Sequence, residues 1–261
     1  MKVRLTAFLI WFLAFMFPLY VQGEGFTYSY KLVYEVLGSA LIYQFVQLVL
    51  PSLAMHLIAL YLAYKALRGE VRPFLAYASI AYLMIAVGQS TALIEGRLVM
   101  ILSNTVLILL AGLLWLRDYL RPVSYEKSGP KWFLPLSLLA FLAPLTSAIE
   151  PTPWTWMWEK ATSQPLFVIP ALIMDALVGY GAVAFCFFTP LALTLAGRNG
   201  ALRPITVKMT AMPGIAFSTI IIVNAVANVL SGVPEGRAFA LLWNALLHVP
   251  LLVTSVYYFK K

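Results

Sequence analysis

Two histidines are the side chains of this chain best suited to cofactor chemistry. His56 and His248 both lie inside long apolar runs, nine residues before Lys65 and twelve before Lys260. At about 1.5 Å per helical residue, both lie near the middle of a bilayer. Such a pair could hold a haem iron, bond a quinone carbonyl or relay protons. The alternative is two separate histidines, each bonded to a backbone carbonyl or a hydroxyl group.

A second candidate site is a layer of polar side chains inside the apolar runs. It comprises Gln89, Asn104, Asp175, Asn224, Asn228 and Asn244. All but Asp175 and Asn224 lie six or seven residues from a glutamate or arginine of an expected outer loop. Polar groups in hydrocarbon are costly and usually face a cavity or a bundle interior. The layer predicts an outer polar cavity in which Asp175 handles protons; for Asn104 and Asn244, hydrogen bonds between helices are the alternative.

Three tryptophans gather in one expected outer loop, at Trp154, Trp156 and Trp158. Tryptophan prefers the membrane interface, so an aromatic belt is one interpretation, and a lid or docking surface for a flat ligand is another. The loop resembles the tryptophan-rich haem-handling segment of cytochrome c maturation proteins. Residues 156–159, Trp-Met-Trp-Glu, stand where that family has Trp-x-Trp-Asp, and residues 243–248 are similar to its histidine segment. The family's leading glycine is absent here, and its acid is replaced by glutamate.

The elements that must position these residues are membrane helices. The chain has 261 residues, of which 62% are hydrophobic and only 11% charged, with a mean hydropathy of +0.88. Soluble domains carry about 25% charged residues. The sequence predicts an all-α polytopic membrane protein in contact with the lipid bilayer. Eight spans are expected, at residues 5–22, 38–64, 73–94, 98–116, 132–149, 166–195, 209–231 and 238–259.

Charge predicts how these spans are oriented. Every second connection is basic, and with the two ends of the chain these connections hold 14 of the 18 lysines and arginines. The positive-inside rule then places both termini in the cytoplasm of a cell-membrane protein. Topology and anionic lipid explain the net charge of +8, so no nucleic-acid partner is expected.

An internal repeat predicts the domain organisation. Glu95-Gly96-Arg97 recurs 140 residues later as Glu235-Gly236-Arg237, and Asn104 recurs as Asn244. We therefore expect two tandem four-helix units, 1–121 and 127–261, inserted in the same direction, the second carrying the tryptophan-rich loop at 150–165. The first span imitates a signal peptide, but its pattern recurs within the fifth span, which favours a retained helix.

The function expected from these patterns is a membrane anchor or electron-transfer subunit. It would bind a quinone or haem b at His56 and His248 and work with redox partner subunits. The architecture is similar to the eight-span anchors of polysulfide-reductase-type molybdenum reductases and to the haem A synthases. The alternative is a transporter or channel for a small solute that uses the outer polar cavity. The single cysteine excludes a disulfide framework and a Cys-based metal site, and whether the chain is an enzyme stays open.

Overall fold

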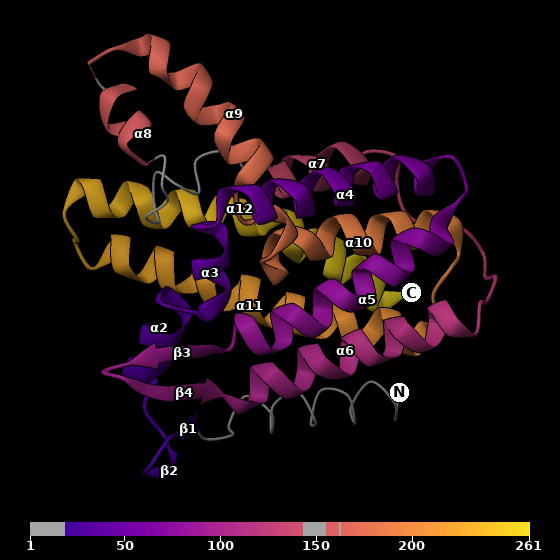
Figure 1. Cartoon of the computed structure of the whole chain (residues 1–261), viewed down its shortest axis with the longest axis horizontal. Helices are drawn as coiled ribbons and strands as arrows, with labels where there is room; N and C mark the ends of the chain where they lie inside the picture. Colours follow the sequence, from indigo (N-terminus) through magenta and orange to yellow (C-terminus); the bar gives the residue numbers. More distant parts are fainter. Residues whose placement is uncertain (1–18, 143–154, 162) are drawn as a thin grey trace.

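The computed structural model describes residues 19–142, 155–161 and 163–261 (Figure 1). Most of these residues form helices that run along one long axis, with a small sheet at one end. The α-helices are α2 (Tyr30–Gly38), α3 (Leu41–Val46), α4 (Val49–Leu67), α5 (Val71–Gly88), α6 (Leu102–Leu120), α7 (Phe133–Leu142), α8 (Thr155–Ala161), α9 (Val168–Val178), α10 (Phe185–Asn199), α11 (Pro204–Leu230) and α12 (Glu235–Lys260). Two short 3₁₀-helices are η2 (Pro165–Phe167) and η3 (Tyr180–Ala182).

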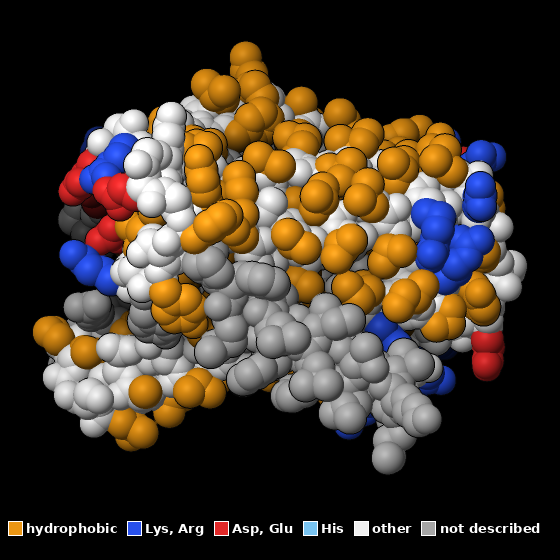
Figure 2. All heavy atoms as spheres, turned by 90° about the horizontal axis from the view of Figure 1, so that it is seen from below, with side chains coloured by type: hydrophobic (Ala, Val, Ile, Leu, Met, Phe, Trp, Pro, Cys, Tyr) orange, Lys and Arg blue, Asp and Glu red, His pale blue; other side chains and the backbone are white. Residues whose placement is uncertain are grey.

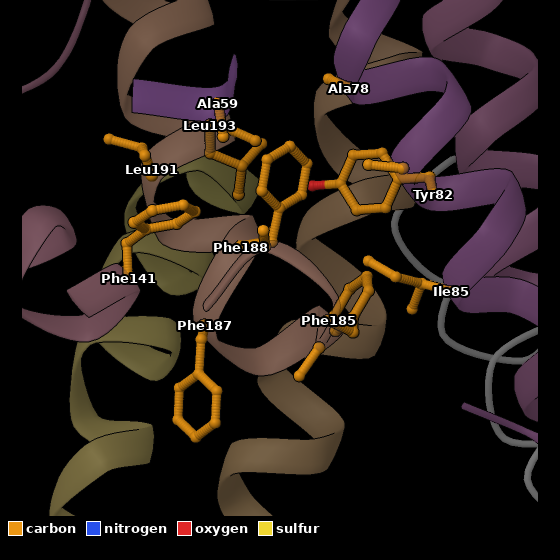
Figure 3. Close-up of a cluster of buried hydrophobic side chains, with 14 of the residues drawn as sticks. Ala59, Ala78, Tyr82, Ile85, Phe141, Phe185, Phe187, Phe188, Leu191 and Leu193 are labelled. Atoms are coloured by element: carbon orange, nitrogen blue, oxygen red, sulfur yellow. The ribbon is translucent and has the colours of Figure 1, made fainter. Parts of the chain in front are cut away.

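The central helix of the bundle is α10. Residues 185–196 of this helix are all buried, and α10 packs against α4, α5, α7, α11 and α12. Phe185 and Phe188 lie against the ring of Tyr82 on α5, with ring centroids 5.9 and 5.4 Å apart (Figure 3). One apolar cluster therefore joins helices of the predicted units 1–121 and 127–261. In the described part of the chain, the two halves share a common core.

A four-stranded antiparallel sheet covers one end of this bundle. Its strands are β1 (Leu19–Val21), β2 (Gly25–Thr27), β3 (Thr91–Ile94) and β4 (Arg97–Ile101), in the order β2-β1-β4-β3. Glu95 and Gly96 join β3 to β4 with φ angles of 51° and 76°. Positive φ angles at both central residues are characteristic of the two-residue type I′ hairpin loop. Leu19, Val36 of α2 and Val99 form a separate small apolar cluster between the sheet and α2.

The sheet corrects the all-α prediction at this end of the molecule. The ends of the expected spans 5–22, 73–94 and 98–116 lie in strands, while residues 5–18 fall outside the described residues. The reason is local, because residues 91–101 combine a tight turn with several β-favouring side chains. The prediction was wrong at these positions because it relied on apolar character and did not consider the residues that favour a turn.

Two expected spans are interrupted. The span 38–64 is divided into α3 and α4. The span 166–195 is divided into α9 and α10 by a buried irregular segment at residues 179–184, which contains η3. Gly179 and Gly181 lie in this segment, and glycine weakens a helix by about 1 kcal/mol relative to alanine. The expected spans 209–231 and 238–259 correspond to α11 and α12, and the described part of 132–149 forms α7.

The outer surface of the bundle suits a membrane. Among the described residues, five helical segments are long and apolar enough to cross one: Val49–Leu67, Val71–Gly88, Pro165–Ala182, Pro204–Leu230 and Leu241–Lys260. Figure 2 shows a broad hydrophobic band with charged side chains gathered at the two ends of the long axis. One end is predominantly basic, and the end that carries the sheet holds acidic and basic groups together. A band of this kind is what contact with lipid tails requires.

The repeated tripeptide adopts two different structures. Glu95-Gly96 forms the hairpin turn and Arg97 begins β4, whereas Glu235-Gly236-Arg237 forms the first turn of α12. Identical residues thus take a conformation set by their surroundings. The expected duplication, the count of eight spans and the orientation of the termini stay predictions.

Candidate functional site

A pocket of about 410 Å³ lies between the sheet, α2 and the helices α6, α11 and α12. Three members of the predicted polar layer line it, namely Asn104, Asn224 and Asn244. Most of the other lining side chains are apolar, and they include Leu19, Val33, Leu37, Ile101, Leu107, Phe217, Ile220, Ile221 and Leu241. The volume falls within the range of small-molecule sites. The residues of this pocket are the candidate functional site.

The asparagines reach the pocket from three different helices. Asn104 lies in the first turn of α6, and its side-chain oxygen Oδ1 is buried without a hydrogen-bond partner among the described residues. Asn224 of α11 accepts a hydrogen bond at Oδ1 from Nδ2 of Asn228, at 3.0 Å. Asn228 does not line the pocket, and its Nδ2 also donates to the backbone carbonyl of Asn224 at 2.8 Å. Asn244 of α12 lines the pocket, and its backbone carbonyl lies 2.7 Å from Nδ1 of His248.

Gln89, the remaining amide of the predicted layer, contacts the irregular segment at 179–184 instead of the pocket. Its Oε1 accepts the backbone N–H of Phe185 at 2.9 Å, which is the first N–H of α10. Ser52 donates from its hydroxyl to the carbonyl of Val178 at 2.9 Å, on the other side of the break. Backbone freed inside a membrane protein must find such partners. The ring of Phe185 then packs edge-to-face on Phe217, a pocket residue, with centroids 5.9 Å apart.

His56 also holds this irregular segment. Its Nδ1 lies 3.0 Å from the carbonyl of Ser52, and its Nε2 accepts the N–H of Ala182 at 3.3 Å. The ring is fully buried and packs on Phe141 of α7 (centroids 5.3 Å apart). Both ring nitrogens are therefore engaged by backbone. To bind an iron or a quinone, His56 would first have to release one of these contacts.

His248 lies elsewhere in the bundle. Its ring packs on Phe187 with centroids 5.8 Å apart, and its Nδ1 bonds the carbonyl of Asn244. Figure 3 shows Phe187 directed away from Phe188 and Tyr82. Among the described residues, the contacts of His56 and those of His248 do not join the two rings to each other. The predicted haem or quinone site at His56 and His248 stays a prediction, as do its redox partners.

Asp175 pairs with the tryptophan-rich segment rather than with the pocket. The indole N–H of Trp158 on α8 donates to Oδ2 of Asp175 on α9 at 3.1 Å, and the carboxylate is buried. Trp156 is partly exposed and packs edge-to-face on Phe167. Trp154 lies outside the described residues. The predicted loop is thus partly helical, and one of its tryptophans satisfies the buried carboxylate.

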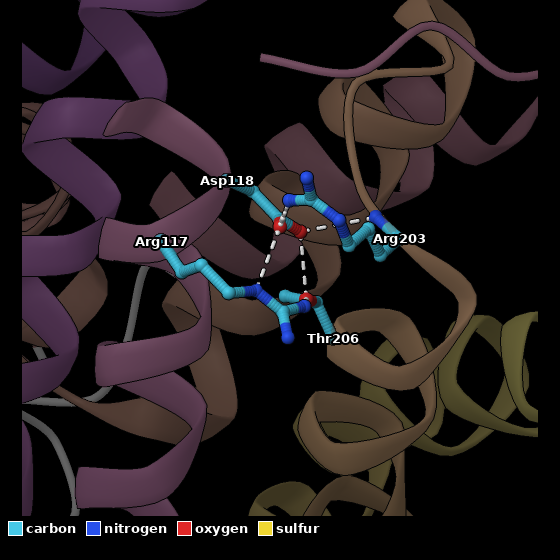
Figure 4. A network of polar contacts seen from close by, with 4 residues as sticks. All are labelled: Arg117, Asp118, Arg203 and Thr206. Carbon is cyan, nitrogen blue, oxygen red and sulfur yellow. Dashed lines mark hydrogen bonds and ion pairs between the residues drawn. The ribbon is translucent and has the colours of Figure 1, made fainter. Parts of the chain in front are cut away.

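A buried ion-pair network at the basic end was not predicted as a site. Asp118, near the end of α6, is fully buried and accepts hydrogen bonds from the hydroxyl of Thr206 at 2.6 Å and from the backbone N–H of Arg203 at 3.0 Å (Figure 4). The guanidinium groups of Arg117 and Arg203 both contact the same carboxylate. The sequence signal was an aspartate beside an arginine at the end of an apolar run. The network holds α6 against the start of α11.

Comparisons with protein-family models, with curated proteins and with solved structures gave no match to this chain. Its function is therefore inferred from the contacts within the chain.

Gln89→Leu is expected to destabilise the protein by about 1–3 kcal/mol, because the N–H of Phe185 would be left buried without an acceptor. Thermal unfolding in detergent measures this effect. Gln22→Leu is the matched control, since Oε1 of the exposed Gln22 accepts the backbone N–H of Leu98 at 3.1 Å, where water can replace it. Equal losses of stability in the two variants would contradict a structural role for Gln89 at the irregular segment between α9 and α10.

Proposed function

We propose that this protein is a membrane transporter or channel that binds a small solute in the pocket between the sheet, α2 and the helices α6, α11 and α12. The observation that carries the proposal is the convergence of Asn104, Asn224 and Asn244 on one apolar pocket. Polar groups are expensive at this depth of a membrane protein and mark ligand sites or pathways. In this proposal the site is amphipathic, since the amides provide a few polar contacts on a mostly apolar wall.

The broken helix supports the movement that transport requires. Discontinuous helices near the middle of a bilayer are a common feature of transporter binding sites. Here the break between α9 and α10 is held by single hydrogen bonds from Ser52, His56 and Gln89. The contact of Phe185 with Phe217 connects this break to the pocket wall. A shift at residues 179–184 would therefore alter the shape of the pocket.

The proposed orientation places the sheet and the pocket at the outer side. The basic end holds the connection between α4 and α5, the end of α6 and the C-terminal lysines, which the positive-inside rule assigns to the cytoplasm. Tyr28 lines the pocket and is 65% exposed, so the pocket reaches the surface at the sheet end. A solute would enter from outside.

Thiol accessibility tests this proposal. In a Cys186→Ala background, Ile220→Cys places a thiol in the pocket wall, and Val223→Cys places one on the same helix at a position that is 60% exposed outside the pocket lining. In intact cells, a membrane-impermeant thiol reagent is expected to modify Ile220→Cys and to spare Val223→Cys, which lipid would cover. Mass spectrometry of the intact protein measures the modified fraction.

Two further cysteines calibrate this experiment. Leu93→Cys on β3, where the native side chain is 54% exposed, should react from outside, and Arg121→Cys at the basic end should react only after permeabilisation. A reactive Leu93→Cys with an unreactive Ile220→Cys would overturn the proposed outer pocket. A Soret band in the purified protein that is lost in His248→Ala would favour the electron-transfer prediction instead.

A further inference from the structure

We infer that the pocket takes an uncharged amphiphile whose hydroxyl-type head group donates a hydrogen bond to Oδ1 of Asn104. The inference rests on the proposed function, because it names the class of solute for the same pocket. It is carried by three features of the pocket wall as formed by the described residues, namely its lack of charged side chains, its apolar area and a buried oxygen without a hydrogen-bond partner.

The lining excludes a charged head group. The described side chains of the wall include asparagine, serine and tyrosine, but none is a lysine, arginine, histidine, aspartate or glutamate. Transferring a charge into such a site without a counter-charge costs many times more than transferring a neutral polar group. Carboxylates, phosphates and ammonium groups are therefore disfavoured. A neutral polar group is what this wall can accept.

The apolar part of the solute has a surface to match. Val33 and Leu37 of α2, with Leu19 and Ile101 of the sheet, provide apolar side chains on one side of the pocket. Phe217 and the neighbouring aliphatic side chains of α11 provide further apolar surface. Burial of apolar area is the main source of affinity in such a pocket. The solute therefore needs an aliphatic or aromatic body.

Asn104 determines which hydrogen-bonding group the head group of the solute must carry. The residue is only 4% exposed, and its Oδ1 has no hydrogen-bond donor among the described residues. Oδ1 is itself buried, so a head group reaches it only when the amide of Asn104 turns toward the pocket; the donated hydrogen bond then removes the cost of a buried acceptor without a donor. Oδ1 of Asn224 already accepts a hydrogen bond from Nδ2 of Asn228, and the Nδ2 group of Asn224 is a donor that requires an acceptor. A hydroxyl group both donates and accepts, which meets the two requirements.

Photolabelling tests the inference. The probe is an octanol analogue that carries a diazirine in its alkyl chain, used with the full-length protein in phosphatidylcholine nanodiscs. Labelled peptides are mapped by mass spectrometry. We expect labelling of pocket residues on α2, α6 or α11, with competition by octan-1-ol but not by methyl octyl ether, octanoate or octylammonium. The ether has the same chain and an oxygen acceptor but no donor.

Variants separate the head-group contact from the pocket itself. Asn104→Leu is expected to reduce pocket labelling by about 2–10-fold, as the loss of one hydrogen bond predicts. Gln44→Leu removes an exposed amide from α3, outside the pocket, and should leave labelling unchanged. The melting temperature of each variant shows that it is folded. Nanodiscs with and without added diacylglycerol distinguish a lipid-borne hydroxyl, which would compete from the bilayer, from a free alcohol.

Different experimental results would contradict the proposed head group and the proposed solute pocket. If the ether competes as well as octan-1-ol, or Asn104→Leu labels like the native protein, the donor requirement is wrong while the solute pocket stands. Competition by octanoate or octylammonium would contradict the neutral head group. If neither the octanol probe nor a diazirine alkane without a hydroxyl labels the pocket residues, the solute pocket itself is wrong.

Discussion

Gly181→Ala is expected to lower the stability of the protein by about 3 kcal/mol, the upper end of the usual cost of overpacking. A Cβ atom at this position would lie 1.7 Å from the backbone carbonyl oxygen of Phe141 and 3.3 Å from Nε2 of His56. A backbone oxygen cannot rotate away as a side chain does, so α7 or the irregular segment at 179–184 must shift. Thermal unfolding in detergent should show a melting temperature lower by roughly 6–12 °C.

The matched control for Gly181→Ala is Gly38→Ala. Gly38 is the last residue of α2, and an added Cβ would meet nothing within 4 Å. Its substitution is expected to be neutral or stabilising, because alanine favours a helix more than glycine does. If Gly181→Ala were as stable as Gly38→Ala, the close packing of α7 on the break would be wrong.

The helical bundle was predictable from hydropathy because a spanning helix needs a long apolar run, and such runs are visible in one sequence. The expected spans 209–231 and 238–259 agree closely with α11 and α12. Hydropathy does not report where such a run stops being helical. At Glu95-Gly96 the turn and the β-favouring neighbours decided the structure, and they could have been recognised as a hairpin signal.

The candidate site was predictable only in part. Counting residues from the expected loops placed Asn104 and Asn244 at one depth with Asn224 near it, because depth in a membrane follows position along a helix, and all three line one pocket. The same count could not separate Gln89, whose side chain points to the break, since depth says nothing of the direction around a helix axis. The sequence analysis did not predict the pocket wall formed by α2 and the sheet. The residues of this wall come close to α11 and α12 only in the tertiary fold, which a count of depth along each helix does not describe.

Asp118→Asn is expected to destabilise the protein by about 2–3 kcal/mol. Removing one partner of a buried ion pair costs about 3–5 kcal/mol, and the side chains of Arg117 and Arg203 are 37% and 26% exposed, so water compensates part of the loss. The hydroxyl of Thr206 and the backbone N–H of Arg203 would both lose a charged acceptor. Chemical or thermal unfolding of the purified protein measures the change.

The exposed pair Lys31–Glu35 provides the control, with side chains that are 89% and 41% exposed and a separation of 3.5 Å. Glu35→Gln is expected to cost less than about 0.5 kcal/mol, and salt should screen even that. The destabilisation by Asp118→Asn should persist at high salt. A loss of stability equal to that of Glu35→Gln would show that the network contributes little.

Because α11 carries Phe217 and Asn224 to the pocket, a loosened start of this helix should also weaken octanol labelling at the opposite end of the bundle. Unchanged labelling in a destabilised Asp118→Asn protein would show that the pocket is held by the sheet end alone.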